Sequence, residues 1–341
     1  MKKTLALLLA LALPFGGPGR YRTGRRMHVT LQERVILAQW ERTRKMDDER
    51  IAKLTPTPGI AEICDLAYIA DGHRGHLLDI YYPEGTKGKL PVIIDIHGGG
   101  FMYGYKELNR MYNLYLSSLG FTVVSLSYRL SPEVRFTAQV QDIAAAFRWI
   151  AKNGWDYPCD MENIFVTGDS AGGLFAVLLP LLEKSPVLRE IYGTEASGLK
   201  IRAVGTVSGA LSMKSSGLAR LLAAPVFGPG YKQNPGYRCL DMRTIPDLER
   251  LPPCYLVTSR QDFVKSHSVE FAEILEERGV PHELRVWPKV QGKRLDHVFS
   301  VTQPTWEESV VTSGEMTAFF RKYMHPQSSR GTSAVGELRS R

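Results

Sequence analysis

A serine set between two glycines, where one apolar run stops and another starts, constrains this chain more than any other feature. The first run ends in Gly168-Asp169-Ser170-Ala171-Gly172, and the second, Leu174 to Leu179, continues in a helix-like pattern. A strand must therefore turn sharply into a helix. Residues two before and two after the serine have no room for side chains in such a turn, which explains both glycines. Ser170 is then held out at the carboxyl end of the strand.

Short apolar runs alternate with helical patterns over most of the chain, beginning with Pro91 to Ile96, and this alternation predicts a parallel sheet. An amphipathic helical pattern spans Leu31 to Leu54, and the acidic pair Asp47-Asp48 could interrupt it. Two alternating stretches joined by Asp71-Gly72 predict an antiparallel hairpin at the edge of the sheet. We expect the hairpin strands at Ala61 to Ala70 and Gly75 to Tyr82, later strands at Val123 to Ser127, Ile164 to Thr167, Ala203 to Val207, Tyr255 to Thr258 and Glu283 to Trp287, and helices near 137–153, 171–183, 266–279 and 305–323.

The length of 341 residues, 44% hydrophobic, suits one large α/β domain or two modest ones, and no linker divides the chain. We assign a signal-like segment to 1–19, an N-terminal helical cap segment to 20–60, an α/β domain to 61–324 and a disordered tail to 325–341. Within the domain, residues 209–251 interrupt the alternation. We read them as an insertion over the carboxyl ends of the strands that forms a lid with the N-terminal helix; an ordinary long crossover is the alternative.

The N-terminus has the charged, apolar, then helix-breaking order of a secretory signal, and its apolar part is too short to span a bilayer. Arg20, Arg22, Arg25 and Arg26 resist translocation, and no Ala-x-Ala cleavage site follows. We expect a secreted or cell-envelope protein. A cytoplasmic protein is the alternative if Met27 is the start or the signal is not used.

Composition argues against two kinds of partner. The net charge is +8, but the basic residues beyond the N-terminal arginines are scattered, so we expect no nucleic acid. The four cysteines, Cys64, Cys159, Cys239 and Cys254, form no Cys-x-x-Cys pair, so we expect no metal site. Their even number permits disulfides but their low density does not require them, and we read them as buried, inert cysteines. Nothing in the sequence indicates an oligomeric state.

Ser170 can act as a nucleophile only if a base reaches its hydroxyl, because that hydroxyl is unreactive at neutral pH. The base is expected later in the chain, where His267, His282, His297 and His325 are the candidates. His282 precedes a strand and so lies at the wrong edge of the sheet, His267 falls in a helix pattern, and His325 lies in the tail. Only His297 follows the last strand on a loop, and we predict it as the base.

The histidine needs a carboxylate that orients its ring and stabilises its charged form. Asp262 follows the strand before the one that leads to His297, and we predict it for this role. Asp296 is the weaker candidate, because neighbouring residues on an extended loop point apart. We read Asp95 and Asp169 as structural.

Negative charge develops on a carbonyl oxygen under attack, and backbone N–H groups can stabilise it. His97-Gly98-Gly99-Gly100 follows an apolar run, and a backbone without side chains can approach a substrate closely. We predict an oxyanion hole formed by Gly98, Gly99 and Ala171, the last at a helix N-terminus. A phosphate loop is the alternative, but the Lys-Ser/Thr ending is missing.

Five motifs together resemble the hormone-sensitive-lipase-like branch of the α/β-hydrolase esterases, over roughly residues 60–323: His97-Gly98-Gly99-Gly100, Tyr128 to Glu133, Gly168 to Gly173, Asp262, and His297-Val298-Phe299. The resemblance implies an α/β fold with a mostly parallel eight-stranded sheet flanked by helices. A helical cap would come from the N-terminus and an insertion after the sixth strand. It also implies a carboxylesterase without a cofactor, in which Ser170, His297 and Asp262 act through an acyl-enzyme and Tyr128 to Glu133 are structural.

The chain departs from that family at Asp262-Phe263-Val264, where Asp-Pro-Leu is usual, and it carries a basic run of Lys289, Lys293 and Arg294 before the histidine. That run could favour acidic or sugar-linked substrates, or be a solvated loop. We predict a small-molecule ester with a short acyl chain, because the cap segments mix apolar and charged residues and leave no wide apolar face. A sugar-ester deacetylase, an amide or formamide hydrolase and a non-catalytic binding relative are the alternatives.

Overall fold

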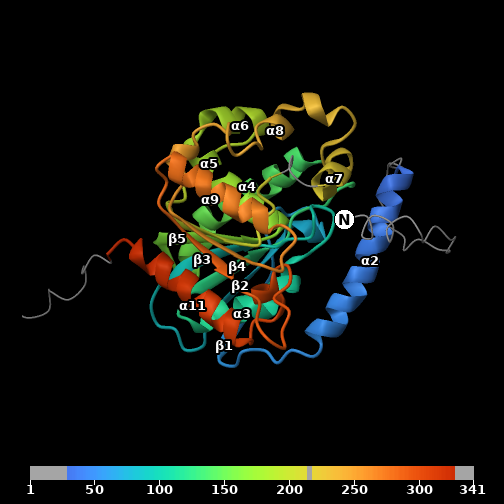
Figure 1. Ribbon diagram of the computed structural model, residues 1–341. Helices are drawn as coiled ribbons and strands as arrows, with labels where there is room; N and C mark the ends of the chain where they lie inside the picture. The colour runs from blue at the N-terminus through green and yellow to red at the C-terminus, as the bar shows by residue number, and fades with distance from the viewer. Residues whose placement is uncertain (1–28, 213–216, 327–341) are drawn as a thin grey trace, which may run out of the picture.

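The structure is a computed structural model that describes residues 29–212 and 217–326 (Figure 1). Its strands are β1 (Ile60–Ala67), β2 (Leu77–Pro83), β3 (Leu90–Ile96), β4 (Thr122–Leu126), β5 (Cys159–Asp169), β6 (Ile201–Val207), β7 (Cys254–Ser259) and β8 (His282–Trp287). They form one eight-stranded sheet in the order β1-β2-β4-β3-β5-β6-β7-β8. β2 is antiparallel to both of its neighbours and all other pairs are parallel. The expected fold class is confirmed.

The helices cover both faces of this sheet. They are α2 (Leu31–Ile51), α3 (Arg110–Ser118), α4 (Phe136–Asn153), α5 (Ala171–Lys184), α6 (Pro186–Tyr192), α7 (Gly217–Phe227), α8 (Pro235–Arg238), α9 (Lys265–Glu277), α10 (Phe299–Thr302) and α11 (Glu307–Lys322), with short 3₁₀ turns at Arg74–His76, Lys106–Asn109, Gly154–Asp156, Tyr231–Gln233 and Leu248–Arg250. In Figure 1, α3 and α11 lie on one side of the sheet and α4, α5 and α9 on the other. The helices α6, α7 and α8 lie beyond this second layer, and α2 runs along one flank.

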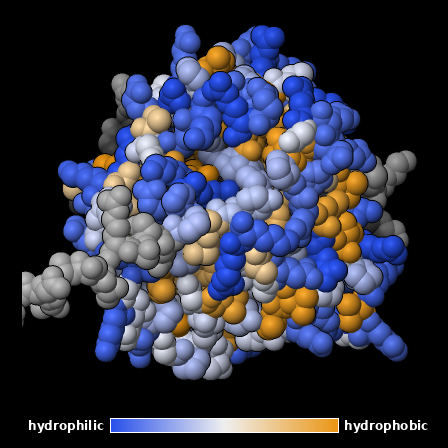
Figure 2. Space-filling model, turned by 90° about the vertical axis from the view of Figure 1, so that its left-hand side faces the viewer, coloured by the Kyte–Doolittle hydropathy of each residue, from blue (hydrophilic) through white to orange (hydrophobic). Residues whose placement is uncertain are grey.

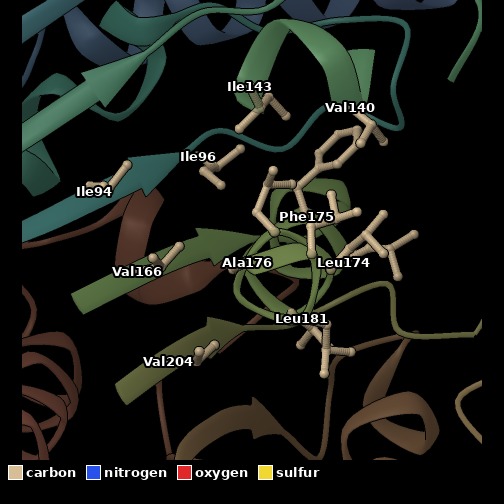
Figure 3. Packing of buried hydrophobic residues seen from close by; sticks show 14 of the residues in the cluster. Ile94, Ile96, Val140, Ile143, Val166, Leu174, Phe175, Ala176, Leu181 and Val204 are labelled. Carbon is tan, nitrogen blue, oxygen red and sulfur yellow. The ribbon is translucent and has the colours of Figure 1, made fainter. Parts of the chain in front are cut away.

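The core has two layers because alternate side chains of each strand point to opposite faces. Ile94 packs toward α4 and α5, whereas Ile93 packs with residues of α3 and α11. Figure 3 shows Phe175 of α5 pointing toward Val140 of α4. Every residue of α5 from Ala171 to Leu182 is buried, so this helix is surrounded by protein. The residue before its first turn, Ser170, is therefore anchored to the most buried helix of the fold.

The predicted edge hairpin forms, but its turn differs from the expected Asp-Gly turn. Ala67 pairs with Leu77, so the connection runs over residues 68–76. Asp71 accepts a hydrogen bond from the His73 N–H at 2.9 Å and contacts His76 Nδ1 at 2.8 Å. Side-chain hydrogen bonds therefore shape this loop, which is longer than the connection over residues 71–74 that the sequence predicts.

Helix α2 continues through Asp47-Asp48, where the sequence allows a break. The Asp47 carboxylate pairs with Arg50 at 3.0 Å and accepts from the Tyr103 hydroxyl at 2.9 Å. Arg50 also donates to the Thr302 carbonyl oxygen at 2.9 Å. The acidic residues therefore tie the end of the helix to the body of the protein, and their charge does not interrupt it.

The other end of α2 is fixed as well. Thr30 and Glu33 form a capping box, in which each side chain accepts from the backbone N–H of the other residue. Glu33 also pairs with Arg135, the residue before α4, at 3.2 Å, and Gln32 donates to the Leu221 carbonyl oxygen of α7 at 2.7 Å. Polar contacts at both ends thus join α2 to the α/β domain and to the insertion.

On the face of the molecule in Figure 2, apolar residues are scattered among hydrophilic ones. Within the described ranges, no single helix is both long and apolar enough to cross a membrane, although the bent pair α5 and α6 passes that test of length and composition jointly. Cys159, Cys239 and Cys254 are buried as expected, but Cys64 is exposed, and all four are free thiols. The signal-like segment 1–19, the arginines that follow it and the tail from 327 onward lie outside the described residues.

Candidate active site

The turn at Ser170 has the tightness that its glycines predict. A Cβ on Gly168 would lie 2.4 Å from the Gly172 carbonyl oxygen, and one on Gly172 would lie 1.9 Å from the Ile96 carbonyl oxygen. Ser170 itself has φ 51° and ψ −115°, a conformation that the surroundings of a non-glycine residue must enforce. Its N–H donates to the Val207 carbonyl oxygen of β6 at 3.0 Å. The neighbouring strand therefore holds the serine in its strained position.

Three predicted residues meet at the carboxyl ends of the strands. Nε2 of His297 lies 2.9 Å from Ser170 Oγ, and Nδ1 lies 2.9 Å from Asp262 Oδ1. When Nδ1–H donates to the carboxylate, the lone pair on Nε2 faces the serine hydroxyl and can accept its proton. The His297 side chain is 20% exposed and that of Asp262 is 0% exposed, so a substrate can reach the base while the acid is sealed from water.

Asp262 accepts hydrogen bonds from other groups in addition to His297. Its Oδ2 accepts from the Thr258 hydroxyl at 3.0 Å, and its Oδ1 accepts from the Val264 N–H at 3.0 Å. Burial by itself would raise the pKa of this carboxyl, but hydrogen bonds from His297, the Ser208 hydroxyl and the backbone outweigh burial and hold the pKa below its usual range. The carboxylate is therefore ionised at neutral pH and can stabilise positive charge on His297.

The other acid and base candidates lie elsewhere. Asp296 pairs with Arg294 at 2.6 Å and is half exposed. His282 is the first residue of β8, and the backbone N–H of His325 donates to Asn163. His267 lies closer to the site than its helix pattern indicates: burial lowers its pKa, and the charges of Asp262 and His297 both act on it.

The structure corrects one predicted member of the oxyanion hole. The Gly98 N–H donates to Asp169 Oδ1 at 2.9 Å, so it is not available to a substrate. We find no acceptor for the N–H groups of Gly99 and Gly100 within the part of the chain that the structure describes. Ala171 is the first residue of α5, where helix N–H groups lack an intrahelical partner. The candidate donors are therefore Gly99, Gly100 and Ala171, and the third glycine of the motif is the one that the sequence prediction missed.

A buried acid pair, Asp95 and Asp169, lies beneath this glycine loop. Asn109 donates through Nδ2 to Asp169 at 2.8 Å and to Asp95 at 3.1 Å, and Asn113 donates to Asp95 at 3.0 Å. Burial, followed by the negative charge of Asp169, raises the pKa of Asp95 to about 7. Burial also raises the pKa of Asp169, against hydrogen bonds from Asn109 and Gly98. The pair supports the loop without contacting His297 through a hydrogen bond.

Tyr128 and Arg129 hold the same region from the other side, in keeping with a structural role. The Tyr128 hydroxyl donates to the His97 carbonyl oxygen at 3.0 Å, and the two rings stack with centroids 4.4 Å apart. Arg129 forms a bidentate pair with buried Asp142. Burial lowers the pKa of His97 to about 4, so this histidine stays neutral and serves as packing.

Helices α2 and α7, which fall in the segments expected to form a cap, each place one side chain near the glycine loop. A Cβ on Gly100 would lie 3.0 Å from Trp40 Cζ2 of α2 and 3.4 Å from Leu222 Cδ1 of α7. Trp40 in turn stacks on Tyr103, with ring centroids 5.1 Å apart. Both cap segments therefore cover the glycine loop, and in Figure 1 they lie at the same side of the molecule. No sequence pattern singles out Trp40 for this contact.

The basic run before His297 is largely neutralised. Lys293 pairs with Glu308 at 2.9 Å, and Arg294 pairs with Asp296 at 2.6 Å. Among the described residues, no three His, Cys, Asp or Glu side chains are grouped as metal ligands would be.

Comparison with known proteins gives a consistent result. A family model described as BD-FAE matches residues 78–218. Carboxylesterase NlhH of Mycobacterium tuberculosis (strain CDC 1551 / Oshkosh) is 28% identical over 232 residues, which cover 63% of this chain and 69% of the relative. Esterase LipI of M. tuberculosis (strain H37Rv) is 27% identical over 266 residues, 69% of this chain and 76% of that one.

Among solved structures, esterase B from Lactobacillus Rhamnosis (HN001) superposes with a TM-score of 0.81 at 28% identity, over 86% of this chain and 95% of that chain. The chain is an α/β-hydrolase esterase. It is a carboxylic ester hydrolase, and these matches are consistent with the hormone-sensitive-lipase-like branch that its motifs resemble.

Proposed function

We propose that this esterase hydrolyses short-acyl carboxylic esters, with Ser170 as nucleophile, His297 as general base and acid, and Asp262 as the orienting carboxylate. One observation carries the proposal: two hydrogen bonds of 2.9 Å link the three side chains in the order that proton transfer requires. A relative that had lost catalysis would have no need to keep a strained serine in contact with a histidine.

The mechanism follows from the placement of these groups. The proton of Ser170 Oγ passes to His297 Nε2 as the Oγ–carbon bond forms, and the carbonyl electron pair moves onto oxygen. The N–H groups of Gly99, Gly100 and Ala171 stabilise that oxygen, and each such donor can contribute about 3 kcal/mol. The carbon–alcohol bond then breaks, and Nε2 gives its proton to the leaving alcohol. Water repeats both steps on the acyl-enzyme and releases the acid.

The cap supports a short acyl chain. Trp40 and Leu222 lie against Gly100, so the space beside the glycine loop is closed by large side chains. Esterase B has been described with a C4-C4 tributyrin phosphonate inhibitor, which fits the same range of acyl lengths. In an open apolar channel each added CH₂ would instead raise kcat/KM roughly fourfold.

The test is a series of p-nitrophenyl acetate, butyrate, hexanoate, octanoate and palmitate, with an amide of butyrate alongside. We expect kcat/KM to be highest between acetate and hexanoate and then to fall, with the amide far slower. The Ser170→Ala variant measures the hydrolysis that does not depend on the proposed nucleophile. A maximum at octanoate or beyond would replace the short-acyl assignment with a lipase, and wild-type rates in Ser170→Ala would remove the serine mechanism.

Secretion or a cell-envelope location remains our proposal, because the signal-like segment lies outside the described residues. Fractionation of cells that express the full chain, followed by N-terminal sequencing, tests it. A cytoplasmic protein that begins at Met27 would overturn it.

A further inference from the structure

Phe263 is a large apolar side chain that is exposed to solvent next to His297. It is 63% exposed, although its two neighbours in the chain, Asp262 and Val264, are 6% and 4% exposed. The centroid of its ring lies 4.4 Å from that of the His297 imidazole, with the two planes inclined at 44°. The phenyl ring therefore covers part of the imidazole and turns its remaining surface to solvent.

The backbone around Phe263 is fixed by the acid. Asp262 accepts from the Val264 N–H at 3.0 Å through its side chain, and its own N–H donates to the Ser259 carbonyl oxygen at 3.3 Å. The Phe263 side chain could become buried only if the side chain of Asp262 or Val264 became exposed in its place. The exposed position of the ring is thus a consequence of the loop that presents the carboxylate to His297.

The placement of the reacting groups decides which half of an ester meets this ring. In the tetrahedral intermediate, the oxyanion faces the Gly99, Gly100 and Ala171 amides, and one bond leads to Ser170. The leaving oxygen must lie within hydrogen-bond distance of His297 Nε2, because it takes its proton from that atom. Of the two organic substituents, the alcohol is therefore the one next to the imidazole and the ring that covers it.

We propose that Phe263 is a specificity-determining residue that contacts the alcohol half of the ester and favours alcohols with an aromatic ring. The inference rests on the proposed Ser170–His297–Asp262 mechanism and extends it to the substrate. The exposed face of the phenyl ring offers an edge-to-face or offset-stacked contact, and such contacts change binding by about three- to tenfold.

The test uses three esters that separate the two halves of the substrate: ethyl acetate, 2-phenylethyl acetate and ethyl phenylacetate. The first two share an acyl group and have leaving alcohols of similar acidity, so their ratio of kcat/KM reports alcohol recognition. We expect Phe263→Ala to lower the 2-phenylethyl acetate to ethyl acetate ratio about three- to tenfold. The ratio of ethyl phenylacetate to ethyl acetate, which reports acyl recognition, should stay the same.

Two further variants control for indirect effects. Phe263→Tyr keeps a ring and should keep the preference. Trp155→Ala removes another exposed aromatic side chain, 58% exposed and outside the described site, and should leave both ratios unchanged. Because Phe263 is exposed, its truncation opens no core cavity, and circular dichroism should match the wild type.

Several outcomes would overturn the inference. An equal loss for all three esters would make Phe263 a support for the acid loop. A change confined to ethyl phenylacetate would place the ring on the acyl side, and unchanged ratios would remove it from recognition altogether. Turnover that persists in Ser170→Ala would instead defeat the proposed mechanism, so the two failures can be told apart.

Discussion

The buried carboxylate of Asp262 and the buried pair Asp95 and Asp169 lie near Ser170, and their surroundings shift their pKa values in opposite directions. Asp262 is surrounded by donors, including a histidine that can carry positive charge, and its pKa is lowered. Asp95 and Asp169 share the neutral amide of Asn109 and lie close to each other, and the pKa of each is raised. The difference shows that burial does not decide the role of an acid. The role of a buried acid depends instead on whether its hydrogen-bond partners can carry a positive charge.

The largest effect should come from Asp262. Asp262→Asn removes the charge that stabilises the imidazolium and can hold the ring in the wrong tautomer, so kcat should fall on the order of 10⁴-fold, as in other serine triads. Asp296→Asn is the matched control, since Asp296 pairs with Arg294, and it should change kcat less than about twofold. Steady-state kinetics with p-nitrophenyl butyrate decides between them. A larger loss of kcat in Asp296→Asn than in Asp262→Asn would assign the orienting role to Asp296.

The second effect concerns the acid pair. Asp169→Ala leaves the Gly98 N–H without its acceptor and leaves the Asn109 amide with Asp95 alone, so the glycine loop should shift and kcat should fall about 10²-fold with little change in KM. Asp169→Asn keeps an acceptor oxygen, so its kcat should fall less than that of Asp169→Ala. If Asp169→Ala had wild-type kcat, the loop would not depend on this hydrogen bond.

Much of the fold could be predicted from local patterns, and Ser170, His297 and Asp262 could be proposed from the turn at Ser170 and from the order of the strands along the chain. The strands β3 to β7 are apolar runs that are buried on both faces, and the glycines on either side of Ser170 indicate a tight turn. The sequence analysis did not predict helix α3, because Arg110–Ser118 mixes polar and apolar residues and the helix is stabilised by packing on the sheet.

The oxyanion hole could be predicted only in part, for a physical reason. The three glycines after His97 are equivalent in sequence, and the assignment depends on which N–H group is taken by another residue. Asp169 takes the first one, and that contact joins residues 71 positions apart. The contacts of Trp40 with the glycine loop and of Phe263 with His297 are likewise tertiary, and no local pattern encodes them.

A smaller effect should appear in the pH dependence of stability. The folded-state pKa of Asp95 is raised to about 7, so folding favours its protonated form. Its contribution to stability is then complete below the unfolded pKa and is lost as pH rises through about 7. In Asp95→Asn this loss is absent. The melting temperature of the variant relative to wild type should therefore increase between about pH 4 and about pH 7 and stay level above that. A constant difference would show that Asp95 does not titrate in this range.

The most direct test of the central claim is covalent labelling of the nucleophile. A p-nitrophenyl alkylphosphonate with a butyl chain should add to wild-type protein once, and peptide mass spectrometry should place the adduct on Ser170. His297→Ala should label at least about 10³-fold more slowly, because the base that activates the hydroxyl is gone. An adduct on another residue, or equal labelling rates in wild type and His297→Ala, would contradict the account of Ser170 as a nucleophile activated by His297 and Asp262.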